Sequence, residues 1–195
     1  MLRRLRELRT YLRAERVDEI ARRYLVMNAF DGALAVLSII VSAYFVGAAE
    51  PQLIVTVGLA TTIAMGISGF TGTYMTERAE RLRRLHELED AMLTDLDKTA
   101  FGTASRIASI YAAFIDGIAP MIAAAISLAP LIIAMFFPIA AQHAVYAAIA
   151  TNLTILFTLG AFLGRISRTN VVVSGLKMVA IGLLTALLCV LMKIA

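Results

Sequence analysis

Two acidic side chains, Asp31 and Asp116, stand inside stretches of sequence that are otherwise apolar enough to be buried in lipid. A carboxylate at membrane depth costs roughly 2.5 to 3.5 kcal/mol on insertion scales, and such residues usually line an ion path or have a partner. Carboxylate oxygens bind hard divalent cations, and they must lose their proton to do so. We therefore expect protons and a metal ion to compete for these two side chains.

The helical face around the first of these acids is small and polar. Residues at a spacing of 3, 4, 3 and 4 share this face: Asn28, Asp31, Ala35, Ser38 and Ser42. Stripes of small residues usually serve helix packing in membranes, which is the interpretation we favour for the two serines. Asn28 and Asp31 remain candidate metal ligands.

Asp116 lies four residues before Pro120. Proline has no N–H, and its ring clashes with the carbonyl four positions earlier, so the backbone oxygen and the carboxylate of Asp116 would meet at one kink. Transporters coordinate cations with such carbonyls at membrane depth. The alternative is a structural kink whose carbonyl bonds to a neighbouring Ser or to water. The segments "AFDGALAV" and "AFIDGIAPMI" are also faintly alike, as expected of a transporter built from related halves.

Four acids beyond the second apolar stretch occur in pairs three residues apart, where two carboxylates on one helix side can share a cation. These pairs are Glu77 with Glu80 and Glu87 with Asp90. The alternative is a solvated helix whose acids bind arginines four residues away. It predicts the pairs Glu77 with Arg81, Glu80 with Arg84, and Arg83 with Glu87. Met65 offers a soft thioether ligand, although methionine in a span is more often apolar filler.

Five apolar segments are long enough to position these residues in a bilayer, which takes about 20 residues per crossing. They cover roughly 25–48, 52–76, 104–136, 139–163 and 171–194. Because 60% of the residues are hydrophobic, we predict an all-α polytopic membrane protein rather than a soluble domain. Its parts are a basic amphipathic arm (1–24), spans one and two (25–76), a charged helical segment continuing span two (77–103), and spans three to five (104–195).

Small residues predict where the spans pack closely. Gly66, Gly69 and Gly72 recur at intervals of three, and "GAFLG" at 160–164 has the small-xxx-small spacing of helix contacts. The chain contains no Ser/His/Asp set, no H-E-x-x-H and no phosphate loop, so we expect no enzyme. Cys189 is the single cysteine, which excludes a disulfide or a cysteine metal cluster within one chain.

Positive charges predict the orientation. Of the 18 Lys and Arg residues, 17 fall in the arm, in the two segments that follow spans two and four, or just inside the next span (Arg106 and Lys177), and only Lys193 falls on the other side. The positive-inside rule puts the N-terminus in the cytoplasm and the C-terminus outside. The same rule explains the net charge of +4 without nucleic acid. The arm either lies along the membrane surface or serves as a topology anchor.

Four segments resemble the vacuolar iron transporter family of five-span Fe(II)/Mn(II) carriers. They are "RRYLVMNAFDGALAVLSIIVSA", "SGFTGTYMTERAE", "AAFIDGIAPMI" and "LGAFLGRISRTNVVVSGLKMVAIGLLTAL". In the second segment Gly72, Tyr74 and Glu80 fit the family's signature, while Thr76 replaces a Ser. In the third, Gly117 and Pro120 fit it. The chain is similar to divergent prokaryotic members with a short cytoplasmic segment.

The resemblance implies a homodimer, a path lined by Asp31 and span-two residues, and metal-binding acids on the cytoplasmic extension of span two. Two departures stand at positions that supply ligands in the family. Gly69 replaces a Met and Thr73 replaces a Glu. Asp116, where the family pattern has no acid, is a candidate to compensate for that loss.

The leading hypothesis is a proton-coupled exporter of Fe(II) or Mn(II) in the cell membrane, with no permanent cofactor. Asp31 and Asp116 would alternately bind metal and protons, and the acids at 77–90 would collect the ion. The competing hypothesis is a membrane scaffold or metal-sensing regulator that does not transport. In it, Asn28, Asn152 or Lys177 caps the aspartates and the basic arm recruits anionic lipid or a partner.

Overall fold

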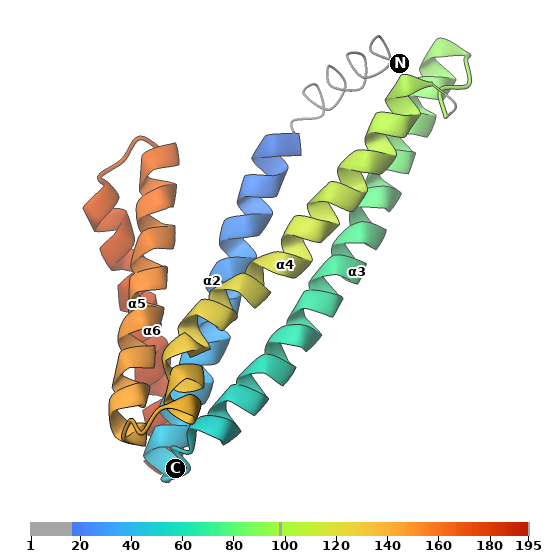
Figure 1. The fold of residues 1–195 in the computed structure, drawn as a ribbon. Helices are drawn as coiled ribbons and strands as arrows, with labels where there is room; N and C mark the ends of the chain where they lie inside the picture. Colours follow the sequence, from blue (N-terminus) through green and yellow to red (C-terminus); the bar gives the residue numbers. More distant parts are fainter. Residues whose placement is uncertain (1–16, 98, 195) are drawn as a thin grey trace. The chain divides into compact units, whose positions relative to one another are not determined.

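The computed structural model describes residues 17–97 and 99–194, and all regular structure in this part of the chain is helical. The helices are α2 (Val17–Val46), α3 (Pro51–Met92), α4 (Ala100–Phe136), α5 (Ala141–Ile166) and α6 (Val171–Ile194), labelled in Figure 1. Each is long and apolar enough to cross a membrane. The predicted all-α protein with five spans is therefore confirmed. Most of the predicted arm, residues 1–16, lies outside the described residues.

Local sequence sets the ends of these helices. Gly47 adopts a φ of +83° after α2, and the amide of Ala48 donates to the carbonyl of Ala43 at 2.9 Å, which is the pattern of a Schellman cap. Pro51 opens α3, at a position where its missing N–H costs no helical hydrogen bond. At the start of α6, Asn170 Oδ1 accepts hydrogen bonds from the amides of Val172 and Val173.

The expected continuation of span two is confirmed as far as Met92, where α3 ends. The charged segment 77–103 is predicted to be helical, but Leu93 has a φ of +51° and a turn follows it. Glu89 Oε1 accepts from the amides of Leu96 and Asp97 at 2.7 and 3.1 Å. These side-chain hydrogen bonds compete with the helical ones, so the chain turns there and α4 starts at Ala100.

The described residues form two compact units, one of 17–25 with 66–97 and 99–118, and one of 26–65 with 119–194. In the second unit, fully buried aliphatic side chains fill the core: Val36, Leu37, Ile40, Ile54, Leu128, Leu131 and Leu156. There α5 packs tightly on α6, since a Cβ at Gly160 would lie 2.5 Å from the Ser174 carbonyl oxygen. The "GAFLG" motif is thus a packing motif, as predicted.

In the first unit α3 packs along α4 through small residues. The buried face of α4 carries alanines at positions 104, 108 and 112, each at most 1% exposed. Their spacing of four keeps them on one side of the helix. Small side chains let two helix backbones approach closely. This close packing positions the first intramembrane site.

Candidate functional site

The carboxylate of Asp116 is buried in the first unit, with 5% of the residue exposed. Its Oδ2 atom accepts a hydrogen bond from the Thr73 hydroxyl at 2.6 Å. Hydrogen bonds to an ionised carboxylate are shorter and stronger than neutral ones. The two residues are 43 positions apart in sequence and lie on different helices, so tertiary packing of α3 on α4 brings them together.

Gly69 lies against the same carboxylate. A Cβ built on Gly69 would come within 3.0 Å of Asp116 Oδ2 and 3.3 Å of the Asp116 carbonyl oxygen. Gly69 and Thr73 are four residues apart and therefore share one face of α3. Gly69 and Thr73, which the resemblance gives as ligand positions, therefore both contact Asp116 of α4.

A close crossing of backbones holds this arrangement. At Gly117, the residue after Asp116, an added Cβ would lie 2.8 Å from the Gly66 carbonyl oxygen and 2.9 Å from Phe70 Cβ. Such distances are too short for any side chain to fit without moving one helix. Of the predicted glycine stripe, Gly66 and Gly69 pack against α4, whereas a Cβ at Gly72 would meet nothing within 4 Å.

Asp31, in the second unit, has a different environment. Its side chain is exposed, and it makes no hydrogen bond or ion pair with any residue that the structure describes. The next residue, Gly32, packs directly on α4, because a Cβ there would lie 2.7 Å from Pro120 Cα. Asn28, one turn before Asp31, is half-buried, as is Met65 on α3.

Two of the residues suggested as caps for the aspartates, Asn152 and Lys177, make no hydrogen bond or ion pair with Asp31 in the part of the chain that the structure describes. The side-chain amide of Asn152, fully buried on α5, donates to the Ala33 carbonyl and to Ser127 Oγ, both at 2.9 Å. Lys177 is exposed on α6, and no ion pair joins it to Asp31 in the described chain. Asn152 therefore ties helices together within the second unit.

The acids in the second half of α3 form ion pairs with arginines. All three pairs that the solvated-helix interpretation predicts are present. They are Glu77–Arg81 at 3.1 Å, Glu80–Arg84 at 3.3 Å and Arg83–Glu87 at 2.7 Å. Arg83 also contacts Glu80 at 2.7 Å. Within residues 17–97 and 99–194, no three His, Cys, Asp or Glu side chains gather as a metal site would require.

Sequence reasoning missed Thr73 as a partner for Asp116, since it treated Thr73 only as a lost ligand. The available signal lay in the resemblance, which implies departures at Gly69 and Thr73, four residues apart on α3, together with an added acid at Asp116 on α4. An added acid together with two missing ligands suggests that Asp116 contacts Gly69 and Thr73. The sequence of one chain, however, does not give the register between α3 and α4.

Two comparisons with known proteins support the resemblance. The VIT family matches residues 78–192, which include Asp116, helices α4 and α5 and most of α6. The uncharacterized protein MJ0645 of Methanocaldococcus jannaschii is 34% identical over 174 residues, which cover 88% of this chain and 87% of that protein. The family match begins at Arg78, five residues after Thr73, so both departures lie outside the matched range.

Proposed function

Because this chain belongs to the VIT family, a family of membrane transporters, we propose that it exports Fe(II) or Mn(II) from the cytoplasm in exchange for protons. Membership in this family and five apolar helices make the chain a multi-pass membrane protein that carries metal ions. The ion, its direction and the coupling to protons are our proposal, as is the location in the cell membrane. The orientation follows the positive charges, with the N-terminus in the cytoplasm.

The observation that carries this proposal is the buried Asp116 carboxylate with its Thr73 hydroxyl at 2.6 Å. Carboxylate and hydroxyl oxygens are hard ligands, which suit divalent ions of the Mn(II) and Fe(II) kind. A carboxylate must be deprotonated to hold a metal, so a proton that arrives at Asp116 releases the ion. When a proton replaces a metal ion at this one carboxylate, proton movement and metal movement are coupled without a second site.

We further propose that Asp116 replaces the acid that family members carry on span two. At this position of α3 the chain has Thr73, and the carboxylate reaches the same place from the opposite helix. The negative charge thus still lies between α3 and α4, whereas Gly69 offers no thioether ligand where the family signature has a Met. Loss of a sulfur ligand shifts the preference toward harder ions, so we expect Mn(II) to be carried in preference to Co(II) or Zn(II).

Asp31 supports the proposal that the working unit is a homodimer. An exposed carboxylate inside an apolar helix costs free energy in lipid unless protein or water covers it. A second copy of the chain packed over this face of α2 would cover both Asp31 side chains and enclose a polar path between them. Asn28, on the same face one turn away, and Met65 are then candidate ligands along that path.

The acids of α3 have a weaker role in this proposal. Glu77, Glu80, Glu87 and Asp90 attract cations toward the membrane surface, but three of them are held by arginines. A metal ion must displace these ion pairs in order to bind there. We therefore assign to these acids the collection of metal at the cytoplasmic entrance.

Transport by the full-length protein in liposomes tests the proposal, with a metal-sensing dye inside and an imposed pH gradient. Wild-type protein is expected to carry Mn(II) and Fe(II), and Asp116→Asn is expected to abolish the flux. Glu50→Gln is the matched control, because it makes the same chemical change in an exposed residue between α2 and α3. Absence of flux in the wild type would reject transport, whereas unchanged flux in Asp116→Asn would reject only the site.

The ion-paired acids favour one other function, a membrane regulator or scaffold that keeps the transporter fold without carrying metal. In the described chain no group of three acidic, His or Cys side chains is assembled for metal. For a regulator, the liposome assay would give no flux for any divalent ion, while isothermal titration of the purified protein with Mn(II) would still detect binding.

A further inference from the structure

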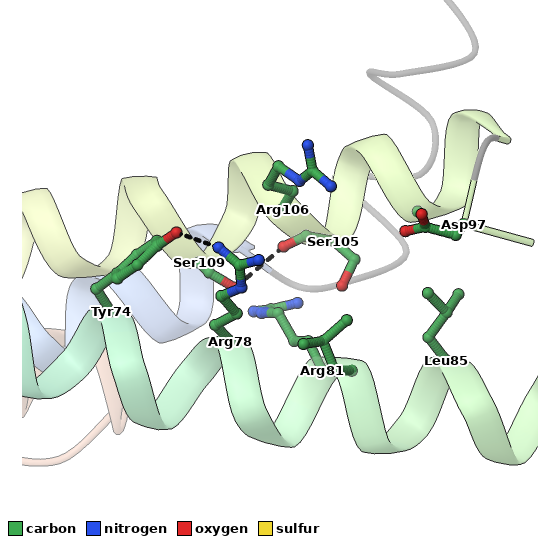
Figure 2. A pocket seen from close by; sticks show the side chains of 10 residues that line it. Tyr74, Arg78, Arg81, Leu85, Asp97, Ser105, Arg106 and Ser109 are labelled. Atoms are coloured by element: carbon green, nitrogen blue, oxygen red, sulfur yellow. Dashed lines mark hydrogen bonds between the residues drawn. The ribbon is translucent and has the colours of Figure 1, made fainter.

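A small pocket lies between α3 and α4 in the first unit, outside the site around Asp116. Figure 2 shows Arg78 and Arg81 of α3 extending toward α4, with Ser105 and Ser109 on the facing side of α4, while the Arg106 side chain extends from the other side of α4. Its polar lining includes Tyr74, Arg78, Arg81, Ser105, Arg106 and Ser109. Asp97 is the one carboxylate in the lining, against three guanidinium groups. The pocket therefore repels metal cations and attracts anions.

Two of the three arginines form no ion pair with a residue that the structure describes. Arg78 donates to the neutral Tyr74 hydroxyl at 2.6 Å and stacks over the tyrosine ring at 5.8 Å. Among described residues, no ion pair involves Arg78 or Arg106, and both are exposed. Arg81 differs, since it is 5% exposed and its Nε atom lies 3.1 Å from Glu77 Oε2. Arg78 and Arg106 are thus the groups available to an incoming anion.

Two hydroxyl groups complete the lining. Ser109 is 1% exposed, and its hydroxyl donates to the Ser105 carbonyl at 3.1 Å. Ser105 is 7% exposed, and its own hydroxyl makes no hydrogen bond with a described residue. Guanidinium groups combined with a hydroxyl donor recognise the oxygens of a phosphate group, because each contact is a charge-assisted hydrogen bond.

The apolar part of α3 ends beside the pocket, as expected for a pocket at the depth of the lipid headgroups. Tyr74 stands near the end of the apolar part of α3, and Arg78 follows four residues later, about 6 Å further along the helix axis. The headgroup layer on one side of a bilayer is about 5 to 8 Å thick. Basic pockets between helices at this depth bind anionic lipid headgroups.

We propose that Arg78, Arg106 and Ser105 form a binding site for a phosphate group, supplied by an anionic phospholipid or by free phosphate. The depth of the pocket favours the lipid. A headgroup bound there would contact both α3 and α4, the two helices that meet at Asp116, and so would stabilise their packing. This inference does not depend on metal transport, because it rests on the charges of Arg78 and Arg106 and not on the Asp116 site.

Calorimetric titration of the full-length protein in detergent tests the site. The probes are a short-chain phosphatidylglycerol, a short-chain phosphatidylcholine and inorganic phosphate, at one ionic strength. We expect phosphatidylglycerol to bind more tightly than phosphatidylcholine. The double variant Arg78→Gln/Arg106→Gln is expected to weaken that binding by about tenfold or more, since each arginine would lose a charge-assisted hydrogen bond to the phosphate oxygens.

The matched control is Arg83→Gln/Arg84→Gln, which removes the same charge from exposed arginines of α3 outside the pocket. It is expected to keep the wild-type affinity. Inorganic phosphate binding with the same sensitivity to Arg78 and Arg106 would support the site and identify the free anion as its source. Equal weakening in the control, or unchanged affinity in the double variant, would overturn the proposal. If the double variant does not fold, unchanged affinity in both single variants would overturn it as well.

Discussion

Asp31 and Asp116 occupy nearly the same local sequence, an aspartate followed by glycine inside an apolar helix, yet one side chain is exposed and the other is buried. Both glycines mark a crossing with another backbone, since Gly32 packs on Pro120 and Gly117 packs on the Gly66 carbonyl. The difference lies in what surrounds each carboxylate. The Asp-Gly pair sets a close helix contact in both units, but only one unit builds a partner for the acid.

This comparison teaches how each carboxylate can work. Asp116 has a hydroxyl partner within the same chain, so its site is complete in a single copy. Asp31 has no hydrogen-bonding or charged partner among the described residues, and a carboxylate in an apolar helix costs free energy in lipid. We therefore propose that the first acid works in a site within one chain and the second at an interface between two copies.

The largest expected effect separates the two acids directly. Asp116→Asn is expected to lower Mn(II) affinity by more than the roughly 100-fold that loss of an outer-shell partner costs, because a ligand is lost. Asp31→Asn is expected to cost less, about tenfold, since its carboxylate is exposed in a single chain. Titration calorimetry of the detergent-solubilised protein measures both. Equal losses of Mn(II) affinity in the two variants would contradict the assignment of the two acids to different kinds of site.

Moving the carboxylate across the helix contact sharpens the assignment of Asp116. Asp116→Ala is expected to abolish Mn(II) flux, and adding Thr73→Glu is expected to restore part of it. The restored acid would extend from α3 into the space that Asp116 leaves, because the two side chains are in contact in the wild type. Flux in liposomes is the measurement. A double variant no more active than Asp116→Ala would argue against a shared position.

Gly32 and Gly117 test the feature that both units share, which is a close helix contact beside the aspartate. Gly32→Ala and Gly117→Ala are each expected to destabilise the protein by about 1 to 3 kcal/mol, as overpacking does, since each Cβ would lie within 2.8 Å of a backbone atom. Gly72→Ala is the control, because a Cβ there meets nothing within 4 Å. Thermal unfolding in detergent gives the result. A neutral substitution at either crossing would break the parallel between the units.

The hydroxyl beside Asp116 is expected to have a moderate effect. Thr73→Val keeps the shape of the side chain but removes the 2.6 Å hydrogen bond. Loss of a partner that orients a ligand lowers metal affinity by about tenfold. Thr71→Val is the control, because the Thr71 hydroxyl on the same helix is exposed and donates only to backbone carbonyls of its own helix. Similar affinities for Thr73→Val and Thr71→Val would remove Thr73 from the site.

The smallest effect is expected for the ion pairs of α3. Glu87→Gln breaks its exposed contact with Arg83 and should change the unfolding free energy by about 0.5 kcal/mol or less. The initial rate of metal uptake should fall by less than twofold, since Arg83 still contacts Glu80. A large loss of flux would indicate that Glu87 binds the metal directly, against the ion-paired arrangement.

Much of the fold and the local pairing could be predicted from the sequence. The five spans follow from the lengths of the apolar runs, and the pairs Glu77–Arg81 and Glu80–Arg84 follow from the helical period, since both partners stand on one helix. The end of α3 at Met92 was not predicted. It depends on Glu89 bonding to the amides of Leu96 and Asp97, and apolar periodicity carries no signal for such contacts.

The sequence by itself determined which residues share a helix face, because that depends only on the 3.6-residue period. It thereby gave Asp31 and Asp116 as the acids inside the spans, and Gly69 and Thr73 as neighbours on α3. Tertiary structure alone decided that Thr73 meets Asp116 while Asp31 stays exposed. The physical reason is register: two helices meet where small residues allow their backbones to approach, and that contact selects which distant side chains touch.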